Sequence, residues 1–345
     1  VTDRLLHNRG DGTFEDVTVS SGISTAFGAG LGVVAADFNN DGWTDIYTAN
    51  DGDPNQLWIN RQGSGQFEDA ALWSGVAVNQ MGLAEAGMGV DAADVDGDGD
   101  EDIFLTHLTQ ESNTFYMNLG DGLFEDRTIQ MGLQVPSLQY TGFGTGFLDY
   151  DNDGWLDLLV LNGAVRVLEE LLRKGDPYPL HQANQLFRNN GQSTYVEVTA
   201  EAGEALRLSE VSRGAAFGDV DNDGDTDVVV FNSNGHARLL LNQVGNRQHW
   251  LGFRLLEKDK QRDSIGARVE VLDKTGKALW RRVRSDGSYC SANDPRVLAG
   301  LGEKKQPRTV RIHWPNGEIE QFENLAVDRY WIIKQGGMPE DASGK

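Results

Sequence analysis

Short apolar runs rich in β-branched and aromatic residues, separated by turns of glycine, asparagine and aspartate, recur along residues 1–249. Each unit opens with a glycine-rich apolar run such as 28–36, continues into a second run such as 45–48, and closes with a strand pair such as 55–60 and 67–69. This pattern predicts about four short strands per unit. Repeated four-stranded units are typical of a β-propeller, so we expect an all-β fold, with about seven blades if the propeller is complete.

An acidic loop of the form D-x-[DN]-x-D-G-x-x-D lies between the first two runs of each unit, starting at Asp37, Asp94, Asp149 and Asp219. The side chains at positions 1, 3, 5 and 9 place several oxygens in one tight turn, where their mutual repulsion favours a bound hard cation. The glycine at position 6 permits positive φ, and position 7 is expected to offer its backbone carbonyl, which leaves its side chain free. We therefore predict about four Ca²⁺ ions. The predicted ligands are Asp37, Asn39, Asp41, Trp43, Asp45, Asp94, Asp96, Asp98, Asp100, Asp102, Asp149, Asp151, Asp153, Trp155, Asp157, Asp219, Asp221, Asp223, Asp225 and Asp227.

The EF-hand is the rival interpretation of these loops, because it opens with the same spacing. It requires a bidentate glutamate at position 12 and helices on both sides, whereas position 12 here is Thr48, Leu105, Val160 or Val230 and the flanks are strand-like. The loops are therefore expected to lead into strands.

The third interval between loops is longer than the others because of an insertion at about 163–183. Residues 164–174 have helical apolar spacing and stop at Gly175, so we expect a helix followed by a proline-rich loop. This insertion could be a lid over a site or a decoration of the disc. His107 and His181 are weak catalytic candidates, and each is more simply interpreted as structural.

The repeats cease at about residue 250, and six alternating segments predict a small β domain over 250–335 that packs on the propeller or completes it. The polar residues 336–345 are expected to be a disordered tail. Of the net charge of −23, residues 1–250 carry −27 and residues 251–345 carry +4. Complementary charge favours docking of the second part on the first, and so acidic a surface disfavours nucleic acid and anionic lipid.

The single cysteine, Cys290, excludes an intrachain disulfide framework, and we interpret its side chain as packed. No apolar run is long enough to insert in a membrane. The chain begins at Val1 without a signal-peptide pattern, so we expect a mature or trimmed product.

Two sets of motifs resemble known families. The loops, the glycine-rich lead-ins and the strand pair at 8–18 resemble FG-GAP/VCBS repeats, and the motifs at 265–269, 287–289, 293–296, 300–302 and 314–317 resemble the ASPIC/UnbV domain. The resemblance implies secreted, extracellular or periplasmic proteins with Ca²⁺ in the propeller loops, and UnbV-type members are associated with enediyne pathways. Asn39 and His107 depart from the pattern of the other units.

Three functions remain open at this stage. The leading hypothesis is a secreted calcium-binding module that presents its loops to a protein or glycan partner. The second is an enzyme, a cyclase or hydrolase acting on a small hydrophobic molecule under the insertion, although no catalytic motif supports it and we lean against it. The third is a lectin that stacks sugars on Trp43 and Trp155, which packing between blades explains equally well.

Overall fold

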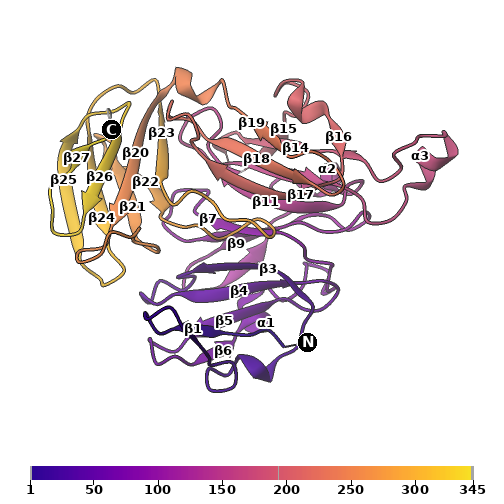
Figure 1. Ribbon diagram of the computed structural model, residues 1–345, viewed down its shortest axis with the longest axis horizontal. Coiled ribbons are helices and arrows are strands. Elements are labelled where there is room, and N and C mark those ends of the chain that lie inside the picture. The colour runs from indigo at the N-terminus through magenta and orange to yellow at the C-terminus, as the bar shows by residue number, and fades with distance from the viewer. Residues whose placement is uncertain (1, 193, 343–345) are drawn as a thin grey trace.

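The computed structural model describes residues 2–192 and 194–342, and these form a nearly all-β molecule of two parts (Figure 1). The first part is an arc of antiparallel sheets, and the second is a two-sheet sandwich on one side of the arc. This arrangement is propeller-like, as the repeats predict.

Three complete four-stranded blades and one three-stranded blade make up the arc. Each blade is a meander whose first strand is the glycine-rich run and whose second strand follows the acidic loop. The blades are β3 (Gly30–Ala36), β4 (Asp45–Asn50), β5 (Gln56–Asn60) and β6 (Phe67–Asp69); β7 (Val90–Ala93), β8 (Asp102–Leu105), β9 (Thr114–Asn118) and β10 (Phe124–Asp126); β11 (Gly142–Leu148), β12 (Asp157–Asn162), β14 (Gln185–Asn189) and β15 (Tyr195–Glu197); and β17 (Ser212–Gly218), β18 (Asp227–Asn232) and β19 (Arg238–Leu240).

Small elements complete the arc. They are the hairpin of β1 (Leu6–Asn8) and β2 (Phe14–Asp16), the pair β13 (Gln182–Ala183) and β16 (Ser209–Glu210), and the short helices η1 (Ile23–Thr25), α1 (Ala71–Ser74), α2 (Gln134–Ser137), α3 (Glu169–Arg173), η2 (Ala205–Arg207) and η3 (Gly245–Arg247). The described residues thus form fewer blades than the predicted total of about seven.

Glycines in or just before the first strand of a blade let neighbouring blades approach closely. A Cβ on Gly89 would lie 1.9 Å from the carbonyl oxygen of Phe143, and one on Gly32 would lie 2.6 Å from that of Met88. Real Cβ atoms do not come so close, so only glycine fits at these positions. Three clusters of buried side chains fill the spaces between successive blades.

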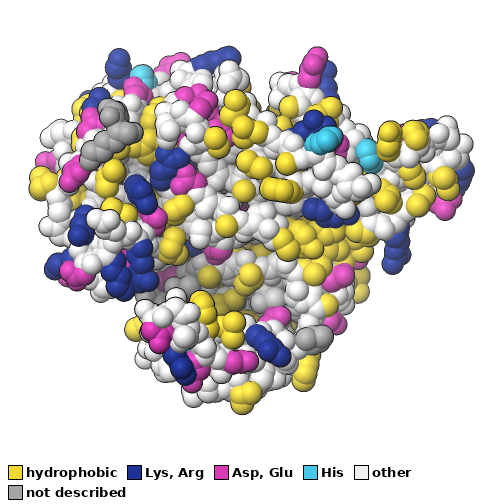
Figure 2. Space-filling model, viewed as in Figure 1, with side chains coloured by type: hydrophobic (Ala, Val, Ile, Leu, Met, Phe, Trp, Pro, Cys, Tyr) yellow, Lys and Arg dark blue, Asp and Glu magenta, His cyan; other side chains and the backbone are white. Residues whose placement is uncertain are grey.

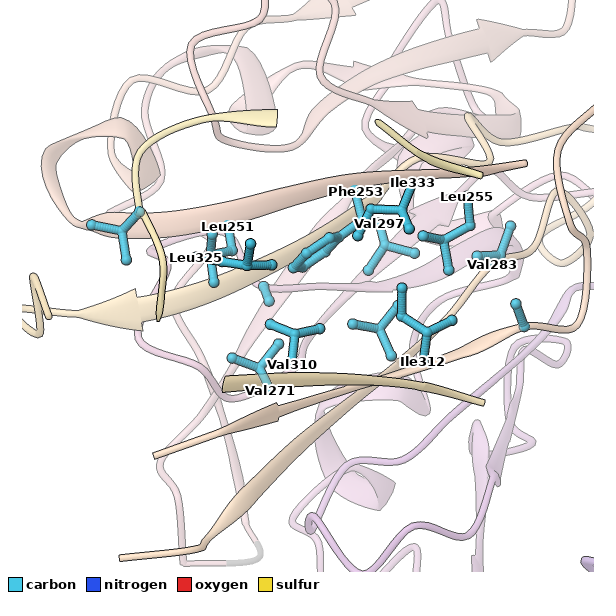
Figure 3. Close-up of a cluster of buried hydrophobic side chains, with 14 of the residues drawn as sticks. Leu251, Phe253, Leu255, Val271, Val283, Val297, Val310, Ile312, Leu325 and Ile333 are labelled. Carbon is cyan, nitrogen blue, oxygen red and sulfur yellow. The ribbon is translucent and has the colours of Figure 1, made fainter. Parts of the chain in front are cut away.

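The C-terminal sandwich packs two four-stranded sheets around one apolar core (Figure 3). Leu251, Phe253, Val269 and Ile312 are fully buried in this core. One sheet contains β23 (Val297–Gly302), β20 (His249–Leu256), β26 (Tyr330–Lys334) and β27 (Glu340–Asp341); the other contains β22 (Ala278–Arg282), β21 (Arg268–Leu272), β24 (Arg308–His313) and β25 (Ile319–Leu325).

The segment from Arg284 to Arg296 leaves the sandwich and crosses the inner strands of the arc (Figure 1). Its Asp286 carboxylate accepts a 2.6 Å hydrogen bond from the N–H of Ala35 in β3. Its Ser288 carbonyl accepts from the N–H of Val90 in β7 at 3.2 Å. The segment therefore satisfies edge groups of several blades, so the sandwich packs on the arc.

Two sequence expectations differ from the structure in the insertion and the tail. The helix α3 covers only Glu169–Arg173, shorter than the predicted 164–174, because no residue of it is buried against the body. It projects away from the blades and is no lid (Figure 1). In the tail predicted to be disordered, residues 340–341 form β27, which pairs with Trp331 and Ile332, while residues 343–345 lie outside the described part.

The structure also differs from the prediction that the Cys290 side chain is packed. Cys290 is exposed and has a φ of 47°, because it lies at the turn of the segment that crosses the inner strands and not within a strand. The packing interpretation of this side chain is therefore wrong.

Candidate metal centres

The four acidic loops share one backbone conformation. The glycine at position 6 has φ between 88° and 99° in every copy, and the carboxylate at position 1 accepts a hydrogen bond from its N–H at 2.8–3.0 Å. Position 4 is also left-handed in each loop, a feature that the sequence analysis missed although Asn occupies it in three of four copies. These residues are Gly42, Gly99, Gly154 and Gly224 at position 6, and Asn40, Gly97, Asn152 and Asn222 at position 4.

The aspartate at position 9 fixes each loop to its own blade. In the second blade, Asp102 accepts hydrogen bonds from the N–H of Val95 at 3.1 Å and of Asn118 at 2.8 Å. The aspartates at position 9 of the other loops make the same two bonds. Position 9 therefore has a structural role in addition to any ligand role.

Carboxylates from positions 1, 3 and 9 converge in three of the loops. In each group, one oxygen from each residue lies within 4.8 Å of the others. Oxygens at this separation can share one metal ion. The groups are Asp94, Asp96 and Asp102; Asp149, Asp151 and Asp157; and Asp219, Asp221 and Asp227.

The loop at Asp37 lacks a third carboxylate in this arrangement, since Asn39 stands at position 3. The oxygen of Asn39 accepts from the N–H of Asp41 at 3.1 Å, as the aspartate does at this position in the last loop. The backbone conformation is thus kept while one charge is lost.

Positions 5 and 7 are not part of the three converging groups. In each loop the carboxylate at position 5 accepts a hydrogen bond from the N–H of position 7; for example, Trp155 N–H donates to Asp153 at 2.9 Å. The expectation that the position 7 side chain is free fails in the last loop, where Asp225 is fully buried and accepts from Asn246 at 3.0 Å. The helix η3, which contains Gly245 and Asn246, packs on this side chain.

The loop at Asp149 gives the strongest sign that a cation fits. Asp149 Oδ1 and Asp151 Oδ1 are buried and have no hydrogen-bond partner. Burial raises the pKa of Asp149 to about 7 and raises that of Asp151. Buried, unpaired carboxylate oxygens are costly unless a cation neutralises them, so this donor set fits an oxygen-preferring ion.

Burial has the same effect on the pKa in the other loops. It raises the pKa of Asp45 and of Asp94 to about 7. It also raises the pKa of Asp37 and Asp219, though hydrogen bonds from the glycine at position 6 oppose the shift. The same electrostatic cost therefore applies to all four loops.

Five arginines of the sandwich side reach toward these loops, and sequence analysis found only their summed charge. We call them the arginine row. They lie at the start of β21, at the end of β22 and just after it, and just before β23: Arg268, Arg281, Arg282, Arg284 and Arg296.

Three members of the arginine row, Arg268, Arg281 and Arg296, each donate to a backbone carbonyl of a loop. Arg282 and Arg284 pair instead with the carboxylates of Glu101 and Asp91. Arg281 Nη2 donates to the carbonyl of Gly154 at 3.1 Å and lies 3.6 Å from Asp149 Oδ2. Arg296 Nη2 donates to the carbonyl of Asp219 at 2.6 Å. The row therefore joins the sandwich to the backbone of the loops and leaves most loop carboxylates available.

The two histidines chosen as catalytic candidates do not form a common site with a nucleophile. His181 stacks on Tyr178 and its Nδ1 lies 2.8 Å from the carbonyl oxygen of Ser209. His107 is buried, neither ring nitrogen has a hydrogen-bond partner, and Nε2 is 3.7 Å from Glu85 Oε2. Both contacts are those of structural residues.

Replacing His107 with asparagine is expected to make stability less sensitive to acid. Burial lowers the pKa of His107 to about 4, so the folded protein keeps the ring neutral. That contribution to stability is complete above the unfolded pKa of ~6.5 and is lost as the pH falls toward 4. The other blades have Asn here, and Asn50 bonds the carbonyl of Pro54 at 2.7 Å.

The measurement for this prediction is the fall in melting temperature between pH 7 and pH 4.5. His107→Asn should reduce the fall relative to wild type, while His7→Asn, at an exposed position of β1, should not. An equal fall in all three proteins would refute the role of His107.

The tryptophans proposed as sugar platforms are partly covered. Trp155 lies under Lys277, whose Nζ is 4.5 Å from its ring, and packs on Gly191. Trp43 is 45% exposed and packs on Gly63. The Trp155 ring is thus covered by Lys277, whereas the Trp43 ring keeps much of its surface exposed.

The fold and its loops define a class, a propeller-like array of acidic repeats joined to a β sandwich. The chain belongs to the FG-GAP repeat family with a C-terminal ASPIC and UnbV domain: the FG-GAP-like repeat matches residues 2–48, 37–105, 94–160 and 177–230, and the ASPIC and UnbV family matches 257–340. It is similar to cartilage acidic protein 1 of Homo sapiens, with 32% identity over 326 residues, 91% of this chain and 37% of the relative. The Mus musculus protein of the same name is 30% identical over 197 residues, 54% of this chain and 28% of the relative. The chain thus spans little more than a third of the human relative.

Solved structures align over much of the chain at low similarity. An Agrocybe aegerita lectin specific for non-reducing terminal N-acetylglucosamine aligns with a TM-score of 0.40 and 13% identity over 94% of this chain and 88% of the lectin. Rhamnogalacturonan lyase YesW aligns with a TM-score of 0.33 and 10% identity over 84% of this chain and 57% of the lyase. In the described part of the chain, no helix has the length and apolar character needed to cross a membrane.

Proposed function

We propose that this chain is a calcium-binding extracellular interaction module. The observation that carries the proposal is the set of converging carboxylates at positions 1, 3 and 9, with two orphaned oxygens in the loop at Asp149. Every side-chain donor in these groups is a carboxylate oxygen, which favours Ca²⁺ over ions that prefer nitrogen or sulfur. When bound, the ion would supply charge neutralisation and hold the loop rigid.

The family and the surface charge support an extracellular role. FG-GAP repeats and similarity to cartilage acidic protein 1 fit an interaction module. Calcium is available at millimolar concentration outside cells, where sites of modest affinity are filled. The acidic blades favour a partner, protein or glycan, that presents cations.

Calorimetric titration of the chelated protein with CaCl₂ is the test. We expect four sites of unequal affinity, with the loop at Asp37 weakest because Asn39 supplies one charge fewer. Asp149→Asn should remove one site, while Asp11→Asn, in an exposed turn outside the loops, should leave the count unchanged. Fewer than three bound ions per chain would overturn the proposal.

A further inference from the structure

A cavity of about 230 Å³ lies between the sandwich and the acidic loops at Asp94 and Asp149. Its walls come from the turn and strand around β22, the ends of β23 and β24, and the two loops. Its lining is half apolar and half polar: Trp155, Trp280, Leu279 and Leu301 contribute apolar surface. The charged side chains that line it are Arg281, Arg308, Lys277, Lys304, Asp94, Asp153 and Asp273. Its volume is below the ~300 Å³ at which drug-sized ligand sites begin, so its occupant must be small.

Arg308 is the unusual member of this lining. It is the first residue of β24 and only 4% exposed, yet its Nε is buried without a hydrogen-bond partner. Within residues 2–192 and 194–342, no carboxylate or carbonyl is bonded to its guanidinium. An arginine stays charged in proteins, and a buried charge without a counter-ion is destabilising, so Arg308 lacks an anion that the chain itself does not supply.

Arg281 adds a second donor to the same cavity. Its two terminal nitrogens bind the carbonyls of Trp280 and Gly154, but its Nε is buried and unpartnered. The arginine is therefore held in place while one N–H remains unused. Both arginines thus line one cavity, and the Nε atom of each is buried without an acceptor.

Three acids line the cavity, and each is already engaged. Asp94 accepts hydrogen bonds from the N–H groups of Gly97 at 2.7 Å and Gly99 at 3.0 Å. Asp273 accepts three hydrogen bonds within its own turn, from Thr275 and Lys277, which lower its pKa. Asp153 binds Trp155 N–H and Arg188. None of these carboxylates is bonded to Arg308, so the cavity keeps an unpaired positive charge. Figure 2 shows Lys and Arg side chains gathered on the part of the sandwich that faces the first blades.

We propose that this cavity binds a small organic anion whose carboxylate or sulfate group pairs with Arg308 and whose compact apolar part lies against Leu279 and Leu301. The planar guanidinium fork matches the oxygens of a carboxylate or sulfate, and charge-assisted hydrogen bonds of this kind are about twice as strong as neutral ones. The apolar walls add affinity for a ring or short hydrocarbon portion. Arg308 belongs to the sandwich, whereas Asp94 and Asp153, which also line the cavity, belong to the acidic loops.

Isothermal calorimetry and tryptophan fluorescence can test the site with the full chain in calcium-containing buffer. The probes are benzoate, phenyl sulfate, inorganic sulfate and uncharged benzamide. We expect both organic anions to bind, inorganic sulfate to bind about tenfold more weakly because it lacks the apolar part, and benzamide not to bind. Absence of binding by both organic anions up to ~10 mM would overturn the proposal, since affinities weaker than this are below ~3 kcal/mol.

Variants locate the binding in the cavity. Arg308→Met keeps the apolar stem of the side chain and should weaken the binding of both organic anions by about tenfold or more. Arg311→Met is the matched control on the same strand, because Arg311 already binds Glu270 and Gln321. Equal weakening by the two variants would contradict the assignment. If Arg308→Met does not fold, Arg308→Lys serves instead, and unchanged binding in that variant would refute the role of the guanidinium fork.

Discussion

Removing calcium with EDTA is expected to lower the melting temperature of the whole chain substantially. Each loop gathers carboxylates whose burial opposes ionisation, and without a disulfide no covalent cross-link restrains the blades. An ion that binds only the folded state at 100 times its Kd stabilises that state by roughly 2.7 kcal/mol per site. The summed stabilisation from several sites is large compared with the free energy of unfolding of an ordinary domain.

The effect of EDTA should also depend on pH. In the metal-free protein, burial raises the pKa of Asp45, Asp94 and Asp149 to about 7. A raised pKa stabilises the folded state below the unfolded value of ~3.9, and this contribution is lost as the pH rises through 7. The metal-free protein should therefore become less stable from pH 5.5 to pH 8.

Differential scanning calorimetry with and without EDTA at both pH values checks these results. The difference in melting temperature between the protein with and without EDTA should be larger at pH 8 than at pH 5.5. In calcium-containing buffer, Asp223→Ala should lower the melting temperature by part of this difference because it disables one loop. Asp11→Asn is the control outside the loops. Unchanged curves in EDTA, with metal loss confirmed by elemental analysis, would exclude a structural role for calcium.

Replacing Arg284 with methionine is expected to destabilise the protein by about 3–5 kcal/mol, because it leaves a buried carboxylate unpaired. Arg284 Nη2 donates to Asp91 Oδ2 at 2.8 Å, and Nη1 contacts Oδ1. The Asp91 side chain is 1% exposed and also accepts from the N–H of Phe147 at 2.8 Å. The pair joins the crossing segment to two inner strands.

Urea denaturation of the variants in a double-mutant cycle measures the coupling free energy between Arg284 and Asp91. Arg284→Met with Asp91→Asn should be less destabilised than the sum of the single variants, since the asparagine removes the unpaired charge. Limited proteolysis near Trp250 should be slow in the wild type and faster in Arg284→Met. Additive effects in the cycle would argue against the pair, and rapid cleavage of the wild type into two stable pieces would indicate a flexible tether.

The repeating four-stranded units, the all-β character and the four acidic loops could all be predicted from the amino-acid sequence. These features depend on local chemistry: glycine where φ is positive, aspartate at fixed spacing, and alternating apolar residues in strands. The positive φ of Gly99 in the loop that starts at Asp94 could be predicted from the nine-residue motif alone. The opposite net charges of residues 1–250 and 251–345 predicted that the sandwich packs on the blades.

The contacts between particular carboxylates and particular arginines follow from the packing of the two parts of the molecule. The pairing of Arg284 with Asp91 joins positions far apart in the sequence, and no local pattern encodes it. The burial of Asp225 depends likewise on how η3 packs on the last loop, and the burial of Arg308 depends on how the sandwich lies against the loops. The physical reason is that burial and pairing arise from surfaces brought together by folding, whereas turns and strands arise from neighbouring residues.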